Sequence, residues 1–179
     1  EQIQLPIEVD TMIGHFLNYY GFLAYMSSHF GQFVFNAKVD KTQLEPFTVG
    51  LSKRFRANAL KLPNSIRTLK KLGRECSNQF EKYDVLMSPV LAHKTPKIGY
   101  FSPDLSYEEV TKRATDYATY TGLYNVTGEP AISLPLGVDS DGMPLGVQFA
   151  APYGEDQRLL ELAFELEAAQ PFRSMFNQA

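Results

Sequence analysis

Through the first third of the chain, apolar residues recur every three or four positions, which is the spacing of one face of an α-helix. The first such stripe consists of Phe16, Tyr19, Tyr20, Leu23 and Met26. It predicts a helix that begins at Asp10 or Thr11, because either side chain can cap a helix amino terminus. Glycine has a low helix propensity, so Gly21 and Gly31 mark positions where this helix can bend.

Two more helices are predicted before residue 82. One begins near Thr48 and should bury Leu51, Phe55 and Ala59. The other begins around Pro63–Ser65, and its apolar stripe consists of Ile66, Leu69, Leu72, Cys76 and Phe80. Cys76 therefore occupies a position where a small core residue belongs. Lys70, Lys71 and Arg74 lie off the stripe and predict a solvated face.

The pattern then changes to short apolar runs. The segment 84–88 is closed by Pro89 and predicts a buried strand, followed by a loop as far as Pro103. The segments 130–138 and 145–150 predict two further strands. The sequence Asp-Ser-Asp-Gly at 139–142 is a strong turn signal between them, which leaves either a hairpin or two strands of a larger sheet.

Two helices are interleaved with these strands. Ser106 and Glu109 form a predicted capping box that opens a helix running to about Tyr124. Gly154-Glu155-Asp156 opens the last helix with acidic side chains in its first turn. Its predicted buried face consists of Leu159, Leu160, Ala163, Phe164, Leu166 and Ala169.

The order of elements predicts an α/β or mixed α+β fold, mainly helical over 1–82 and built of strands and helices over 83–172. With 179 residues the chain is one domain or one large piece of a domain. Three short strands make a small sheet for this length, and strands supplied from elsewhere would explain it.

Composition removes several classes of function. The net charge of −3 offers no basic face for nucleic acid. The single cysteine, Cys76, excludes a disulfide-stapled secreted scaffold and is compatible with a cytoplasmic protein. The aromatic stretch Met12–Val34 is interrupted by six polar residues, too many for a bilayer span, so no membrane contact is expected.

Catalytic patterns are weak. No phosphate-cradling glycine loop follows a strand, and the three histidines have no metal-site spacing, so we expect no metal and no cofactor. Ser27-Ser28-His29 places a nucleophile beside a base, but adjacent residues on a helix do not face each other. The sequence therefore predicts no catalytic residue in this chain.

Four segments of the second half resemble, in order, motifs of the amidase signature family. Tyr83–Pro89 is similar to its "yDvLltP" strand, and Thr119–Ala131 to its "fT-x-x-x-N-x-tG-x-Pa" segment. Gly142–Phe149 is similar to the "G-l-P-x-G-x-Q" strand, and Asp156–Glu167 to the closing helix. The joint resemblance implies the C-terminal portion of the amidase signature fold over 1–179, a mixed sheet with flanking helices.

The resemblance also implies amide hydrolysis by a Ser–Ser–Lys triad held in a glycine- and serine-rich region upstream of this segment. No such region is present here, so Ser27, Ser28 and Lys38 are not assigned to the triad, and the chain alone is expected to be inactive. The resemblance implies a wall of the substrate pocket at Thr115, Ala118 and Gly122, which would share one helix face. Close packing of the helix explains these small residues equally well.

Three functions remain open. The first is an amidase for small-molecule amides, and the second is the amidase-like subunit of a tRNA-dependent amidotransferase. Such subunits resemble this family but carry a substrate-binding aspartate where this chain has Ala118. The third is a non-catalytic protein-binding module. Exposed strand edges predict homo-oligomers in each case, because unpaired edges recruit other chains.

Overall fold

The computed structural model describes residues 1–3, 8–36 and 38–172. The chain forms two compact units, each assembled from segments that are distant in sequence. The helical unit combines Glu1–Gly73 with Thr95–Tyr117, and the sheet unit combines Arg74–Lys94 with Ala118–Ala179.

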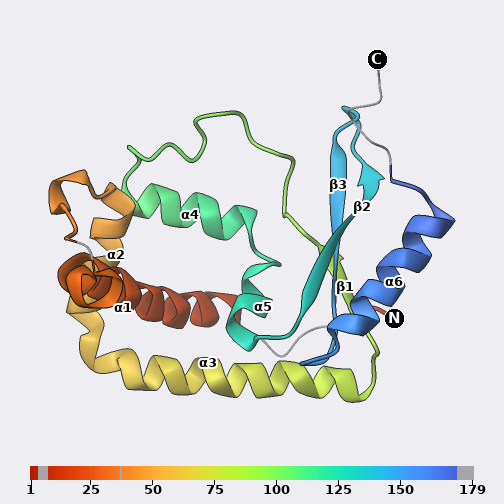
Figure 1. Ribbon diagram of the computed structural model, residues 1–179, viewed down its shortest axis with the longest axis horizontal. Coiled ribbons are helices and arrows are strands. Elements are labelled where there is room, and N and C mark those ends of the chain that lie inside the picture. The colour runs from red at the N-terminus through yellow and green to blue at the C-terminus, as the bar shows by residue number, and fades with distance from the viewer. Residues whose placement is uncertain (4–7, 37, 173–179) are drawn as a thin grey trace. The chain divides into compact units, whose positions relative to one another are not determined.

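The helical unit contains α1 (Val9–Phe35), α2 (Pro46–Asn58) and α4 (Tyr107–Tyr117) (Figure 1). Two short 3-10 helices, η1 (Lys41–Gln43) and η2 (Ala59–Lys61), precede and follow α2. Helix α3 (Leu62–Ser77) begins in this unit and carries the boundary to the sheet unit between its residues 73 and 74.

Helices α1 and α2 pack closely through aromatic side chains. The ring of Phe55 lies 5.4 Å from that of Phe22 and 5.4 Å from that of Tyr25, measured between centroids. Leu51 and Phe55 are buried as predicted, whereas Ala59 lies in η2 and is exposed, because α2 ends one residue earlier.

The start of α1 differs from the prediction. Its amino-terminal cap is Glu8, which makes no side-chain capping hydrogen bond, so the helix begins before Asp10 and Thr11. The predicted bend is present at Phe30, where φ is −123° and ψ is 17°, next to Gly31.

Helix α4 has a partial capping box. The Ser106 hydroxyl accepts a hydrogen bond from the Glu109 amide at 3.1 Å, as predicted. The Glu109 carboxylate does not complete the box but accepts a 2.6 Å hydrogen bond from Nε of Arg113 one turn later. The guanidinium of Arg113 also lies 4.7 Å from the ring centre of Tyr100, so this one side chain ties the loop to the helix.

The prediction that this helix continues to about Tyr124 is wrong, because α4 ends at Tyr117. A turn follows, in which the Ala118 carbonyl accepts a 3.3 Å hydrogen bond from the Thr121 hydroxyl. A separate short helix, α5 (Gly122–Thr127), begins after it.

The sheet unit is built on three antiparallel strands, β1 (Leu86–Pro89), β2 (Ala131–Val138) and β3 (Pro144–Ala150), in the order β1-β3-β2. Strand β3 pairs with β2 as a hairpin, which settles the alternative left open by the sequence. Figure 1 shows this hairpin beside β1. All three strands are present, but β1 begins two residues later than predicted and is not a buried strand, since Met87 is exposed.

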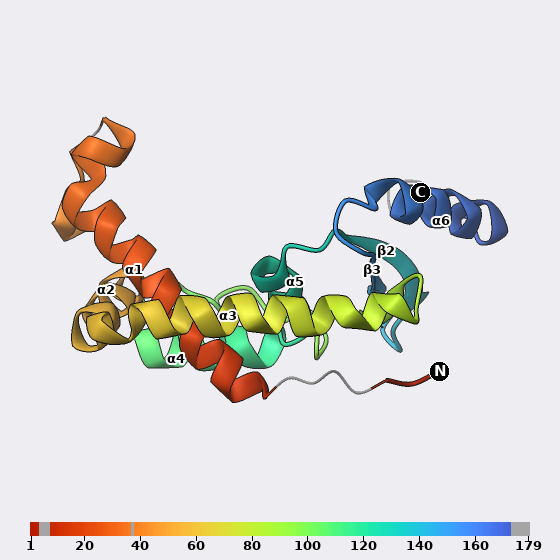
Figure 2. The ribbon, with the colours of Figure 1, turned by 90° about the horizontal axis from the view of Figure 1, so that it is seen from below.

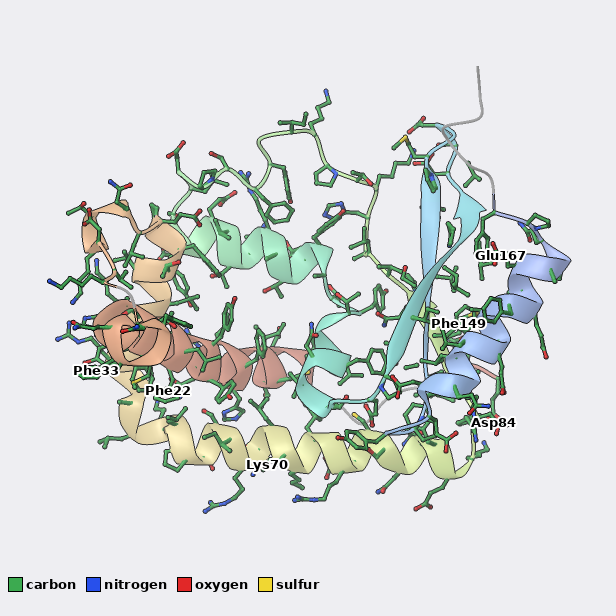
Figure 3. All side chains as sticks on the ribbon, in the orientation of Figure 1. Phe22, Phe33, Lys70, Asp84, Phe149 and Glu167 are labelled. Atoms are coloured by element: carbon green, nitrogen blue, oxygen red, sulfur yellow. The ribbon has the colours of Figure 1, made fainter. Side chains whose placement is uncertain are left out.

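Helix α6 (Asp156–Ala169) covers one face of the sheet (Figure 1, Figure 2). Leu159 packs with Leu134, Phe149 and Ala151 in a buried cluster, and Figure 3 labels Phe149 on the side facing α6. The side chains of α6 that join this cluster are Leu159, Leu162, Ala163 and Leu166. Leu160, Phe164 and Ala169 are exposed, which corrects the predicted buried face, because the stripe that meets the sheet is offset from them.

The hairpin turn at 139–142 is held by charge and by backbone bonds. The Asp139 side chain is only 7% exposed, and its oxygens accept from the amides of Asp141 and Met143. The bond from Met143 contributes most to holding the pKa of Asp139 below its ordinary value, with the Asp141 amide and the Lys94 ammonium acting in the same direction against burial. Gly142 takes φ of +80°, which favours glycine.

We expect Gly21→Ala to destabilise the helical unit. A methyl group at Gly21 would lie 2.6 Å from the Leu51 carbonyl oxygen and 3.1 Å from Cβ of Phe55, so α1 and α2 must move apart. Overpacking of this kind costs about 1–3 kcal/mol. Gly14→Ala on the same helix is the matched control, since a methyl group there meets nothing within 4 Å and should gain about 0.5–1 kcal/mol. Urea unfolding of both variants measures the difference, and shifts of the same sign would contradict the close approach.

The second expectation concerns acid stability. Because folding lowers the pKa of Asp139, its charged form stabilises the turn above the ordinary pKa of 3.8, and this contribution is lost as the pH falls through the lowered value. Titration by NMR should therefore place the Asp139 carboxyl midpoint below 3.8. Asp139→Asn should flatten the fall in unfolding free energy as the pH drops below 3.8. A midpoint at or above the ordinary value would contradict a role for this turn in acid stability.

Candidate functional site

The three residues predicted to line a substrate pocket do not share one helix. Thr115 lies in the last turn of α4, Ala118 in the turn that follows, and Gly122 at the first position of α5. All three are half-buried. The common helix face expected from their spacing is therefore wrong, because the helix ends between the first and the second of them.

Ala118 and Gly122 belong to the sheet unit and are joined by the backbone. The Gly122 amide donates to the Ala118 carbonyl at 3.4 Å, which places the two residues at either end of one turn. A methyl group at Gly122 would meet no atom within 4 Å. Close packing against a described residue therefore does not require glycine here, which weakens the packing explanation at this position.

A buried carboxylate lies directly after α5. Glu129 is 5% exposed, and its Oε1 accepts a 2.7 Å hydrogen bond from the Ser77 hydroxyl at the end of α3. Its second oxygen, Oε2, is buried and has no hydrogen-bond partner among the described residues. The motifs considered above did not point to this residue, although an acid between Gly128 and Pro130 at the entrance to a strand is a signal for it.

Two weakly acidic side chains, Cys76 and Tyr124, interact electrostatically with Glu129. Burial, with the Glu129 charge second, raises the pKa of Cys76 to about 11 and that of Tyr124 to about 12. Both groups therefore stay protonated at neutral pH. Cys76 is a core side chain and not an activated thiolate, as its place on the apolar stripe predicted.

Ser28 and His29 are closer than helical geometry alone suggested. The Ser28 hydroxyl lies 3.0 Å from Nδ1 of His29, within hydrogen-bond distance. It also lies 2.7 Å from the Ala24 carbonyl and 3.2 Å from the Tyr25 carbonyl, either of which can accept its proton. Nδ1 of His29 lies 3.1 Å from the same Tyr25 carbonyl, so both side chains contact the backbone of their own helix.

The other histidines have structural partners as well. Nδ1 of His15 lies 3.1 Å from the Ser65 hydroxyl, and Nδ1 of His93 lies 2.8 Å from the Lys94 carbonyl. No group of three His, Cys, Asp or Glu side chains among residues 1–3, 8–36 and 38–172 is arranged to hold a metal ion. In the same residues, no helix has the length and apolar character to cross a bilayer.

Solved structures define the class of fold. The structure of 6-aminohexanoate cyclic dimer hydrolase is similar with a TM-score of 0.78 and 25% identity, over 90% of this chain and 35% of that one. A bacterial aryl acylamidase of the amidase signature family is similar with a TM-score of 0.64 and 18% identity, over 94% of this chain and 35% of the other. The architecture is thus that of part of an amidase signature fold.

Sequence comparison gives the family. The family model described as Amidase matches residues 18–160. A protein of Mycobacterium leprae (strain TN) named "Putative amidase AmiC" is 45% identical over 172 residues, which is 96% of this chain and 36% of that protein. The chain belongs to the amidase family, as the four motifs indicated. It spans about a third of the length of this relative.

We expect Glu129 and Ser77 to be energetically coupled. Glu129→Ala should lower the free energy of unfolding by about 1–3 kcal/mol, because it removes the acceptor of this hydrogen bond and leaves a void in its place. A double-mutant cycle with Ser77→Ala should give a non-zero coupling energy, measured by urea unfolding. Glu167→Ala, at an exposed position of α6, is the control and should stay within about 0.5 kcal/mol of the parent. Additive effects in the cycle would show that the bond contributes nothing.

Proposed function

We propose that the protein containing this chain hydrolyses carboxylic amide C–N bonds. The observation that carries the proposal is 45% identity over 172 residues to a relative named as an amidase, together with the family match over residues 18–160. A further relative, 40% identical over 96 residues, is named 6-aminohexanoate-cyclic-dimer hydrolase, in Pseudomonas sp. (strain NK87). The match covers 50% of this chain and 20% of that protein. This similarity supports linear or cyclic amides as the substrate class.

The reaction proceeds in two steps through an acyl-enzyme. A serine hydroxyl attacks the amide carbonyl carbon, the C–N bond breaks, and the amine leaves with a proton. Water then attacks the ester carbonyl, which releases the carboxylic acid and restores the hydroxyl. The serines and lysine of this chemistry are assigned to residues outside this chain. The polar contacts of Ser28 support that assignment, because its hydroxyl lies within hydrogen-bond distance of two carbonyls of its own helix.

In this proposal the chain supplies scaffold and part of the pocket wall. The hairpin β2–β3 and helix α6 form a buried cluster that holds the sheet rigid. Ala118 and Gly122, both in the sheet unit, lie along this wall and leave room for the substrate. Thr115, at the end of α4 in the helical unit, stays a separate prediction from the resemblance. The open space around Gly122 supports its part in the wall, since glycine there leaves room that no described side chain fills.

A second candidate is the amidase-like subunit of a tRNA-dependent amidotransferase. A glutamyl-tRNA(Gln) amidotransferase subunit from Aliarcobacter butzleri (strain RM4018) is 41% identical over 95 residues, which is 53% of this chain and 19% of that protein. A protein of this kind would need a partner subunit and a residue that binds the amine of glutamine. Ala118 has no polar group to bind that amine, so the amidase is the stronger candidate.

The test uses Gly122→Leu in the whole protein. If Gly122 lines the pocket, the added volume should lower kcat/KM for a bulky anilide about ten- to two-hundredfold more than for a small carboxamide such as propionamide. Ala118→Phe should act in the same direction. Ala168→Leu, at an exposed position of α6, enlarges a side chain away from the proposed wall and should leave both rates unchanged.

The possible outcomes test the amidase function and the assignment of the pocket-wall residues independently. A parent protein that releases no amine from any amide would remove the amidase function, and ammonia release from glutamine alone would favour the amidotransferase. Equal losses for large and small substrates, together with a lower melting temperature, would keep the function and remove the wall residues. Hydrolysis by the 179-residue chain alone would contradict the assignment of the nucleophile to residues elsewhere.

A further inference from the structure

The helical unit contains a polar pocket that the amide chemistry does not use. Its cavity volume is about 250 Å³, and it lies where α1, α2, η2 and the start of α3 meet. All of its lining residues belong to this one unit. They are Thr11, Gly14, His15, Asn18, Arg54, Asn58, Lys61, Asn64 and Ser65. Every side chain on this lining is polar, which is unusual for a gap between helices.

The lining carries positive charge without a counter-charge. Arg54 and Lys61 contribute two cationic groups, and no described aspartate or glutamate lines the pocket. Nη2 of Arg54 donates to the Gly14 carbonyl at a long 3.5 Å. Its Nε is buried and has no hydrogen-bond partner among the described residues. A partly buried guanidinium with an unsatisfied donor is costly, so the site favours an anion.

One wall of the pocket is a fixed polar network. Asn18 is 4% exposed and donates from Nδ2 to the Ser65 hydroxyl at 3.1 Å. The same hydroxyl lies 3.1 Å from Nδ1 of His15, so Ser65 links α1 to α3. The amide oxygen Oδ1 of Asn18 is buried and has no partner in the described part of the chain. The pocket therefore holds an unsatisfied acceptor as well as unsatisfied donors.

We propose that this pocket binds a small carboxylate. The guanidinium of Arg54 matches the two oxygens of a carboxylate, and Lys61 at the rim adds a second positive charge. The volume corresponds to about eight water molecules at ~30 Å³ each, which suits a short organic acid and not a drug-sized ligand. A hydrogen-bond donor on the acid would satisfy the oxygen of Asn18, so short hydroxy or amino acids fit best.

The alternative is a purely structural role, in which Arg54 ties α2 to α1 through the Gly14 carbonyl. That role needs one donor and leaves Nε, Lys61 and the amide oxygen of Asn18 unexplained. It also predicts no response to added anions. Inorganic phosphate is also an anion that the two cationic side chains could bind. It is tetrahedral and more highly charged than a carboxylate, so the experiment tests it separately.

The experiment compares propionate with butanone, which has nearly the same shape, no charge and no amide bond that the protein could hydrolyse. Calorimetric titration of the protein should show binding of propionate and a rise in melting temperature, with butanone and phosphate at least about tenfold weaker. Arg54→Met should weaken propionate binding about tenfold or more, and Lys61→Met about threefold. Arg56→Met, at an exposed position of the same helix, is the matched control and should bind as the parent does.

Each outcome decides the proposal. Equal binding of propionate and butanone, tighter binding of phosphate, or no binding of propionate to the parent protein would overturn it. So would an equal loss of affinity in the Arg54 and Arg56 variants. If Arg54→Met does not fold, the parent with its two isosteric ligands and the Lys61 variant still give the answer. Glycolate, which adds a hydroxyl donor, should bind more tightly than acetate if the Asn18 oxygen takes part.

Discussion

The sheet unit depends on the pairing of β3 with two neighbours at once. Residues 147–150 of β3 bond to β1 on one edge and to β2 on the other, so the central strand leaves few backbone groups unpaired. This double pairing aligns Phe149 with Ile132, and both then pack in the cluster covered by α6. Backbone groups buried without partners are costly, so this pairing is what allows α6 to cover the face of the sheet. A slip of one residue in β3 would turn every core side chain away from α6.

The helical unit is organised by close approach instead of backbone pairing. Gly21 lets α1 come within contact of the α2 backbone, and Gly50 lets α2 meet the ring of Tyr107 on α4 in the same way. A small residue at a helix crossing brings two aromatic stripes into van der Waals contact, which is where most of the packing energy arises. The aromatic cluster around Phe55 follows from this spacing.

Six buried side-chain atoms have no hydrogen-bond partner among the described residues, and two of them, Arg54 Nε and Asn18 Oδ1, line the same pocket. The other four, Tyr107 Oη, Thr111 Oγ1, Thr127 Oγ1 and Glu129 Oε2, lie outside it. Folded proteins satisfy most such atoms, so a donor and an acceptor left open in one cavity are the strongest argument for a ligand there.

Local chemistry along the sequence determined the helices over residues 9–77, the three strands, the Asp-Gly hairpin turn and the membership of the amidase family. These features depend on hydrophobic periodicity, on turn residues and on short motifs, all of which are recognisable without knowledge of tertiary contacts. Only the structure showed that α4 ends at Tyr117, since the sequence from Ser106 to Tyr124 is consistent with one continuous helix. Only it showed the bond between Ser77 and Glu129 and the pocket around Arg54. Ser77 lies 52 residues from Glu129 along the chain, and Asn18 lies 47 residues from Ser65. Spacing in sequence carries no information on contacts that distant segments make, and both features are made of such contacts.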